Sequence, residues 1–128
     1  MKVEVSAAIE ELKRQFPESS FTAREDGQGG AYVIIEAVKI GPRFRPEITW
    51  FGFHIPPLYP YADIYPVFIG PDVVRVDGVP FTPPVTHGAN FDGRQAIQVS
   101  RRNGVAGQGL QKATAKILKV LDFLERMP

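Results

Sequence analysis

The chain has 128 residues and a formal net charge of +1; 44% of its residues are hydrophobic and 23% are charged. This length predicts one domain, residues 1–128, with one modest core, and the composition is that of a globular chain rather than a disordered one. With a net charge so close to zero, the chain has no overall electrostatic attraction for nucleic acid or for a membrane surface. The absence of cysteine excludes disulfides, thiolate metal sites and a cysteine nucleophile.

The N-terminal segment has the pattern of an amphipathic helix, because apolar residues recur at spacings of four, three and four. The residues of this stripe are Val5, Ile9, Leu12 and Phe16. Pro17 ends the pattern, since the residue before a proline is disfavoured in a helix. The spacing predicts a helix over residues 3–16.

Four runs typical of β-strands follow. They cover residues 21–26, 31–40, 47–55 and 67–69. Glycines at 27, 29 and 30 indicate a hairpin turn between the first two runs, and Gly41-Pro42 turns the chain toward the third. Alternation along the second run divides its side chains between two faces of the strand. One face carries Tyr32, Ile34, Val38 and Ile40, and the other carries Val33, Ile35 and Ala37. The order predicts a four-stranded antiparallel meander.

The chain after Pro71 divides into an interrupted segment and a second helix. Prolines and glycines, such as Pro84 and Gly93, interrupt the first segment too often for a strand or helix, which favours a long, ordered, irregular loop. From Leu110 an apolar stripe returns and predicts a helix that ends near Arg126. With both helices covering one face of the sheet, we expect an α+β domain.

Candidate catalytic and metal-binding residues are few. His54 and His87 have no further histidine or cysteine to complete a metal site, so we expect no metal and no cofactor. Ser100, His87 and Asp92 supply the residue types of a catalytic triad, but a triad is defined by geometry and no Gly-x-Ser-x-Gly surrounds Ser100. No apolar run is long enough to span a membrane and no signal-peptide pattern is present, so we expect a cytoplasmic protein.

The order of these elements and three motifs resemble the UBC fold of ubiquitin-conjugating enzymes. Residues 53–60 (Phe-His-Ile-Pro-Pro-Leu-Tyr-Pro), followed by Pro-Val-Phe at 66–68, resemble the family's aromatic strand, Tyr-Pro turn and fourth strand. Residues 87–90 (His-Gly-Ala-Asn) resemble its His-Pro-Asn motif, with one inserted residue and no proline. Residues 93–97 resemble its Gly-x-x-Cys-Leu segment and align Ala96 with the nucleophilic cysteine.

The resemblance implies a binding role rather than catalysis. Conjugating enzymes carry the modifier as a thioester on cysteine, and alanine provides no nucleophile. Residues 91–103, followed by a C-terminal helix, are similar to divergent prokaryotic UBC-like families found with bacterial ubiquitin-like conjugation systems. We therefore expect a conjugating-enzyme variant that binds a ubiquitin-like protein, or an activating or conjugating partner enzyme, and neither nucleic acid nor membrane.

The resemblance also assigns residues to the site. The equivalents of the silent catalytic site are Ala96, Asn90 and His87. The residues expected to bind a partner are Tyr59, Phe91, Asp92, Gly93, Arg94, Ser100, Arg101 and Arg102. The ring of Tyr59, which lies among prolines, is also expected to be buried and to fasten its loop against the sheet.

Two alternatives remain open at this point. One is an active conjugating enzyme whose cysteine has been replaced by alanine at position 96. The other is an interaction domain of the related RWD type, or an unrelated α+β domain. The RWD alternative depends on whether the segment after Pro71 folds into a flap like that of an active site.

Overall fold

The computed structural model describes residues 1–102 and 111–128. Their elements are α1 (Val3–Gln15), β1 (Phe21–Glu25), β2 (Ala31–Lys39), β3 (Phe44–Arg45), β4 (Ile48–Ile55), β5 (Val67–Ile69), β6 (Val74–Arg75), β7 (Val85–Phe91), β8 (Arg94–Val99) and α2 (Ala113–Arg126). Six strands form one sheet in the order β1-β2-β4-β5-β8-β7, with every neighbouring pair antiparallel, and β3 and β6 form a separate two-stranded ribbon. The expected α+β class is confirmed.

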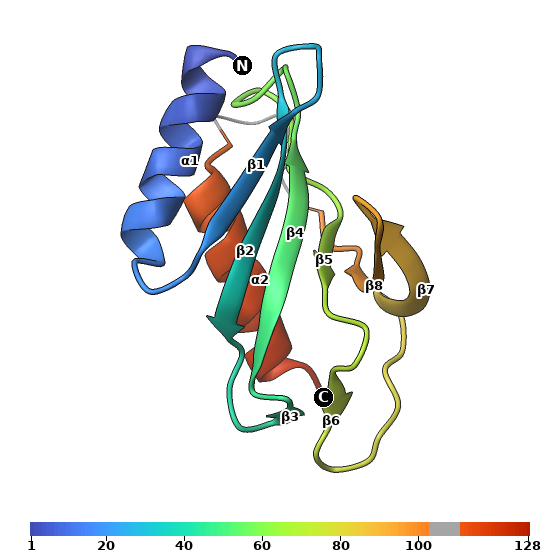
Figure 1. The fold of residues 1–128 in the computed structure, drawn as a ribbon. Helices are drawn as coiled ribbons and strands as arrows, with labels where there is room; N and C mark the ends of the chain where they lie inside the picture. The colour runs from blue at the N-terminus through green and yellow to red at the C-terminus, as the bar shows by residue number, and fades with distance from the viewer. Residues whose placement is uncertain (103–110) are drawn as a thin grey trace.

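Both helices cover the same face of the large sheet, and the main hydrophobic core lies between the two layers (Figure 1). The helices contribute the stripes that the sequence predicts, and the buried residues of α1 are Val5, Ala8, Ile9 and Leu12. Both predicted helices are confirmed, although Leu110, where the second was expected to begin, lies outside the described residues. Within the part of the chain that the structure describes, no helix is long and apolar enough to cross a membrane.

The sheet has six strands rather than the expected four. The first four expected strands are β1, β2, β4 and β5, and the additional pair is the β7–β8 hairpin. The expectation of an irregular loop is therefore wrong for residues 85–96, which lie in this hairpin. The residues that argued against strands do not break the ladder: Pro84 precedes β7, Gly88 lies where the pairing of β7 with β8 shifts register, and Gly93 lies in the turn. The sheet continues through β8, which pairs with β5.

A β-bulge in β2 changes which residues face the core. The register of β2 against β4 shifts between Ile35 and Val38, and Ala37 has a positive φ of 59°. Because the extra residue reverses the alternation beyond it, Val38 is only 2% exposed and belongs to the same core as Val33. The strict alternation predicted from the sequence, which placed Val38 on the face of Tyr32, is wrong at this point.

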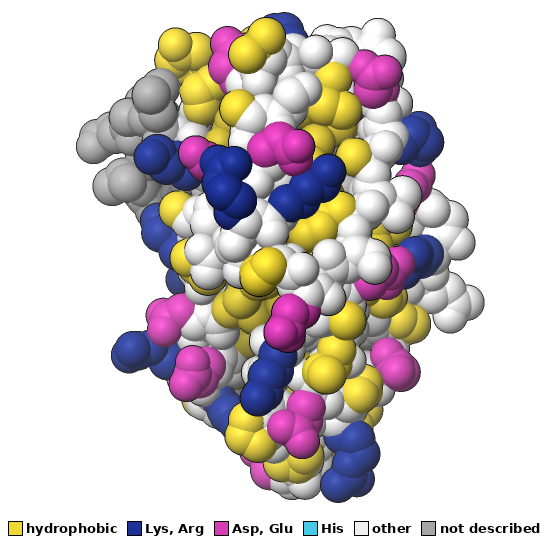
Figure 2. Space-filling model, turned by 60° about the vertical axis from the view of Figure 1, so that its left-hand side comes forward, with side chains coloured by type: hydrophobic (Ala, Val, Ile, Leu, Met, Phe, Trp, Pro, Cys, Tyr) yellow, Lys and Arg dark blue, Asp and Glu magenta, His cyan; other side chains and the backbone are white. Residues whose placement is uncertain are grey.

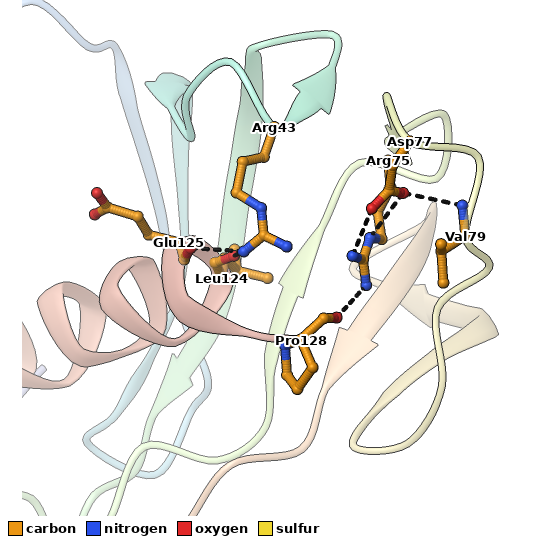
Figure 3. A network of polar contacts seen from close by, with 7 residues as sticks. All are labelled: Arg43, Arg75, Asp77, Val79, Leu124, Glu125 and Pro128. Atoms are coloured by element: carbon orange, nitrogen blue, oxygen red, sulfur yellow. Dashed lines mark hydrogen bonds and ion pairs between the residues drawn. The ribbon is translucent and has the colours of Figure 1, made fainter.

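Two arginines hold the C-terminal end of α2 (Figure 3). Arg43, which precedes β3, donates a hydrogen bond to the carbonyl oxygen of Glu125 at 2.6 Å. Arg75 of β6 donates to the carbonyl oxygen of Pro128 and pairs with Asp77 at 2.7 Å. The cations lie near the negative end of the helix dipole, where the last carbonyl groups lack partners within the helix. The β3–β6 ribbon is thereby joined to α2.

Candidate functional site

The β7–β8 hairpin brings together the three residues that were aligned with a silent catalytic site. Ala96 of β8 is paired with Ala89 of β7, and Asn90 is the next residue along β7. His87, Asn90 and Ala96 contribute to the lining of one surface hollow of about 360 Å³. His87 and Asn90 are exposed, so an imidazole and a carboxamide are available to a partner at this hollow.

Ala96 itself is buried, with only 2% of its surface exposed. It packs with Ile34 and Phe91 in a second, smaller hydrophobic cluster on the sheet face opposite the helices. A reactive thiol has to be accessible and close to groups that stabilise the thiolate. A cysteine side chain in this position would instead lie in apolar surroundings, which do not stabilise a thiolate.

The hairpin turn explains why this region is regular despite its glycines. Asp92 and Gly93 form the two-residue connection between Phe91 and Arg94, which are paired across the strands. Both residues have positive φ, of 49° and 85°, as a type I′ turn requires. Asp-Gly between two strand-like runs is a known hairpin signal, and it could have identified β7 and β8 from the sequence.

The tip of the hairpin is fastened to the open face of the sheet. Asp92 forms an ion pair with Arg24 of β1, and Arg94 pairs with Glu36 of β2 at 2.7 Å. The hydrogen bond to Glu36 raises the pKa of the Arg94 guanidinium. The ring of Phe91 is buried. The sequence assigned these tip residues to partner binding, whereas in the fold Phe91, Asp92 and Arg94 make intramolecular contacts.

The residues of the hypothetical triad have other partners. The hydroxyl of Ser100 accepts a hydrogen bond from Gln98 at 2.8 Å, Asp92 pairs with Arg24, and the ring of His87 lies 5.9 Å from that of Phe81. No hydrogen bond joins the three among residues 1–102 and 111–128. These described ranges also contain no group of three potential ligands that could hold a metal ion.

His54 forms a polar contact at the end of β4. Its ring pairs with Asp26 at 2.7 Å and stacks on Tyr32, with 4.6 Å between ring centroids. The hydrogen bond with His54, together with those from the backbone N–H groups of Gln28 and Gly30, lowers the pKa of Asp26. This carboxylate therefore organises the β1–β2 turn, and His54 supports it.

Tyr59 is 7% exposed, so the predicted burial of its ring is confirmed. Its hydroxyl accepts a hydrogen bond from the backbone N–H of Ala113, the first residue of α2, at 3.1 Å. The loop is thereby fastened to α2 as well as to the core. A buried ring is not available to a partner, which removes Tyr59 from the surface that the sequence suggested.

The two arginines after β8 lie at the opposite end of this strand from the hairpin tip. Arg101 places its guanidinium 4.7 Å from the ring centre of Phe123, and Arg102 lies 3.8 Å from that of Tyr65. Because β8 is extended, Gly93 and Arg101 are separated by roughly 25 Å. The residues assigned to partner binding therefore divide between two separate regions.

Sequence reasoning missed a group of cations beside these arginines. A small hollow of about 40 Å³ is lined by Arg101, Arg102, Lys116, Lys119 and Val120. Lys116 is buried, at 4% exposure, and pairs with Asp63 at 3.1 Å. The amphipathic stripe of α2 leaves Lys116 off its apolar face, so the sequence contained no signal of this burial.

Compared with models of protein families, with curated proteins and with solved structures, the chain matches none.

Proposed function

We propose that the chain is a non-catalytic UBC-like protein that binds a ubiquitin-like modifier, or a partner enzyme, in a bacterial ubiquitin-like conjugation pathway. The order of elements supports this proposal: α1, the meander β1-β2-β4-β5, the β7–β8 hairpin and then α2. The observation that carries it is the position of Ala96, whose buried methyl group shares a hollow with His87 and Asn90. The three residues that the resemblance identifies are thus neighbours.

The chemistry of this site supports reversible binding. Thioester transfer needs a cysteine, and the chain has none. Asn90 and His87 are exposed and offer hydrogen-bond donors and acceptors at the hollow. A partner is therefore bound through non-covalent contacts at this surface.

The test combines an activating enzyme, ATP and a ubiquitin-like protein of such a pathway with the unmodified chain. We expect a reversible complex, measured by calorimetry, and no reductant-sensitive adduct. An adduct that is stable to thiols and maps to Ser100 or to a lysine would overturn the assignment of Ala96 as the silent centre. If neither the modifier nor any enzyme of the pathway binds, the proposed binding role is wrong.

The Ala96→Cys variant addresses the first alternative, an active enzyme that carries alanine in place of its cysteine. Formation of a thioester in this variant would favour that alternative, as would a cysteine codon at position 96 of the native gene. The 2% exposure of Ala96 supports the non-catalytic role, because a reactive thiol has to be accessible.

An RWD-type interaction domain is the second alternative. The region after Pro71 bears on this alternative: it folds into β6 and the β7–β8 hairpin, and the hairpin carries all three residues aligned with the silent site. The hairpin is paired into the sheet through β8, so a binding experiment has to separate the two readings. Binding of a protein partner with no response to variants of His87 or Asn90 would favour the RWD alternative.

A further inference from the structure

The small hollow at the end of β8 has an unusual density of positive charge. We call it the basic hollow, and its lining residues are Arg101, Arg102, Lys116, Lys119 and Val120. Two of the cations come from the chain after β8 and two from α2, so only the tertiary structure brings them together. Arg101, Arg102 and Lys119 are exposed.

Most of this charge is not neutralised by ion pairs within the part of the chain that the structure describes. Lys116 forms an ion pair with Asp63. Among residues 1–102 and 111–128, no carboxylate forms an ion pair with Arg101, Arg102 or Lys119. Like charges held close together repel one another, so an arrangement of this kind is favourable when a negative group occupies the space between them.

The two arginines are also held in position. Each guanidinium lies over an aromatic ring, Arg101 over Phe123 and Arg102 over Tyr65, and such cation–π contacts restrict the side chains. The ammonium of Lys116 donates a hydrogen bond to the carbonyl oxygen of Arg101, which holds the backbone there. An arginine that stacks on a ring keeps its N–H edge available for bidentate binding of a carboxylate.

We propose that the basic hollow binds an acidic segment of a protein partner, with one carboxylate between Arg101, Arg102 and Lys119. This inference rests on the proposed binding role and names the chemistry of the partner. A hollow of about 40 Å³ has room for a single small group. The side chain of Val120 provides an apolar wall beside the charges.

Charge and size favour a protein partner over nucleic acid. Nucleic-acid-binding proteins commonly neutralise several phosphates along a basic stripe. Here the cluster contains three exposed cations and the net charge of the chain is +1. On the face shown in Figure 2, Lys and Arg side chains are interspersed with Asp and Glu, and no basic stripe crosses it.

The direct test measures binding of a hexaglutamate peptide at low ionic strength, where screening is weakest. In the isotope-labelled protein, the peptide should shift the amide signals of Arg101, Arg102 and Lys119. The double variant Arg101→Glu/Arg102→Glu should bind at least about tenfold more weakly, because two charge-assisted contacts become repulsive. The matched control is Arg14→Glu/Lys39→Glu, which changes two exposed cations elsewhere by the same total charge and should bind as the unmodified chain does.

Lys119→Glu provides a second variant that disturbs no ring contact of the arginines. It should also weaken binding while circular dichroism and the melting temperature stay unchanged. Equal affinity in Lys119→Glu, in the double variant and in the control would overturn the inference. The inference would also be overturned, in favour of a nucleic-acid ligand, if an oligonucleotide of equal charge bound more tightly than hexaglutamate and lost its binding in the same variants.

The same variants separate this inference from the proposed function. If a ubiquitin-like modifier binds the unmodified chain and the double variant equally well, the inference is wrong and the proposed function stands. If hexaglutamate binds through the basic hollow but no modifier or enzyme of the pathway binds, the acidic ligand chemistry is supported and the pathway assignment is wrong.

Discussion

The ring of Phe91 lies against the backbone of Gly52, so closely that a Cβ atom at position 52 would be 2.6 Å from Cδ2 of Phe91. Glycine inside a strand usually weakens it, and it often marks a close approach by another group. Here the approaching group is the last residue of β7, and its ring fills the space that a side chain on β4 would occupy. The contact holds the hairpin against the open face of the sheet.

Gly52→Ala should therefore destabilise the protein by about 1–3 kcal/mol, because the added methyl group displaces the ring of Phe91. Urea denaturation measures this change. In a Phe91→Ala background the same substitution should cost less, although Trp50 Cζ3 would still lie 2.9 Å from the new Cβ atom. An equal cost in both backgrounds would show that Phe91 is not the obstacle.

Tyr59 provides a test of how the loop is attached to α2. Tyr59→Ala should cost about 3–5 kcal/mol, since it removes a buried ring. Tyr59→Phe should cost about 1–3 kcal/mol, because the buried N–H of Ala113 loses its acceptor. The matched control is Tyr61→Ala, a residue that is 76% exposed, which should change stability by less than about 0.5 kcal/mol. A cost below about 1 kcal/mol for Tyr59→Ala would contradict this account.

Stability should depend on pH in the acid range through Asp77 and Asp26. The N–H of Val79 and the guanidinium of Arg75 lower the pKa of Asp77, and the hydrogen bond with His54 is the main cause that lowers the pKa of Asp26. Because each pKa is lower in the folded state, the unfolded state takes up protons first on acidification. The contribution to stability is present above the unfolded pKa of about 3.9 and is lost as the pH falls through the folded value.

The Asp77→Asn variant tests this linkage. Asparagine still accepts from the N–H of Val79 but carries no charge, so the acid decline of the urea midpoint should be shallower than in the unmodified chain. Glu18→Gln is the control, because Glu18 is exposed and has no ion pair among the described residues. Identical acid profiles for Asp77→Asn and the unmodified chain would exclude a contribution from this carboxylate.

Because the chain contains no cysteine, an introduced thiol is a specific probe of the hairpin. In Ala96→Cys the thiol should react slowly with a thiol-specific reagent, because the site is 2% exposed, and rapidly once urea unfolds the chain. Asn90→Cys, at an exposed position of the same hairpin, is the matched control and should react rapidly in the folded state. Equal rates for the two thiols would show that the hairpin opens and exposes position 96.

Local patterns in the sequence were sufficient for several elements. The apolar spacing of Val5, Ile9 and Leu12 identified α1, and the strand-like runs identified β1, β2, β4 and β5. The burial of Tyr59 was also predicted, because prolines restrict the backbone around an aromatic ring. Each of these features depends on residues close together in the chain, where periodicity and backbone preference act directly.

The place of the β7–β8 hairpin in the sheet required the tertiary structure. The Asp92-Gly93 signal is local, but it was outweighed by nearby prolines and glycines, and β8 joins the sheet by pairing with the distant β5. The face on which Val38 lies depends on a single bulge, which alternation does not reveal. The sequence shows a glycine at position 52, but it does not show that the ring of Phe91 packs against it.

The division of the expected binding residues was also decided by the fold. Arg94 and Arg101 are seven positions apart in the sequence, which suggested one surface. An extended strand separates them, so that Arg94 pairs with Glu36 on the sheet while Arg101 joins Lys119 of α2 at the basic hollow. The sequence by itself determined which residues carry charge. Only the long-range packing of β8 and α2 determined which of those charges form no ion pair among the described residues, because ion pairing depends on distance in space rather than along the chain.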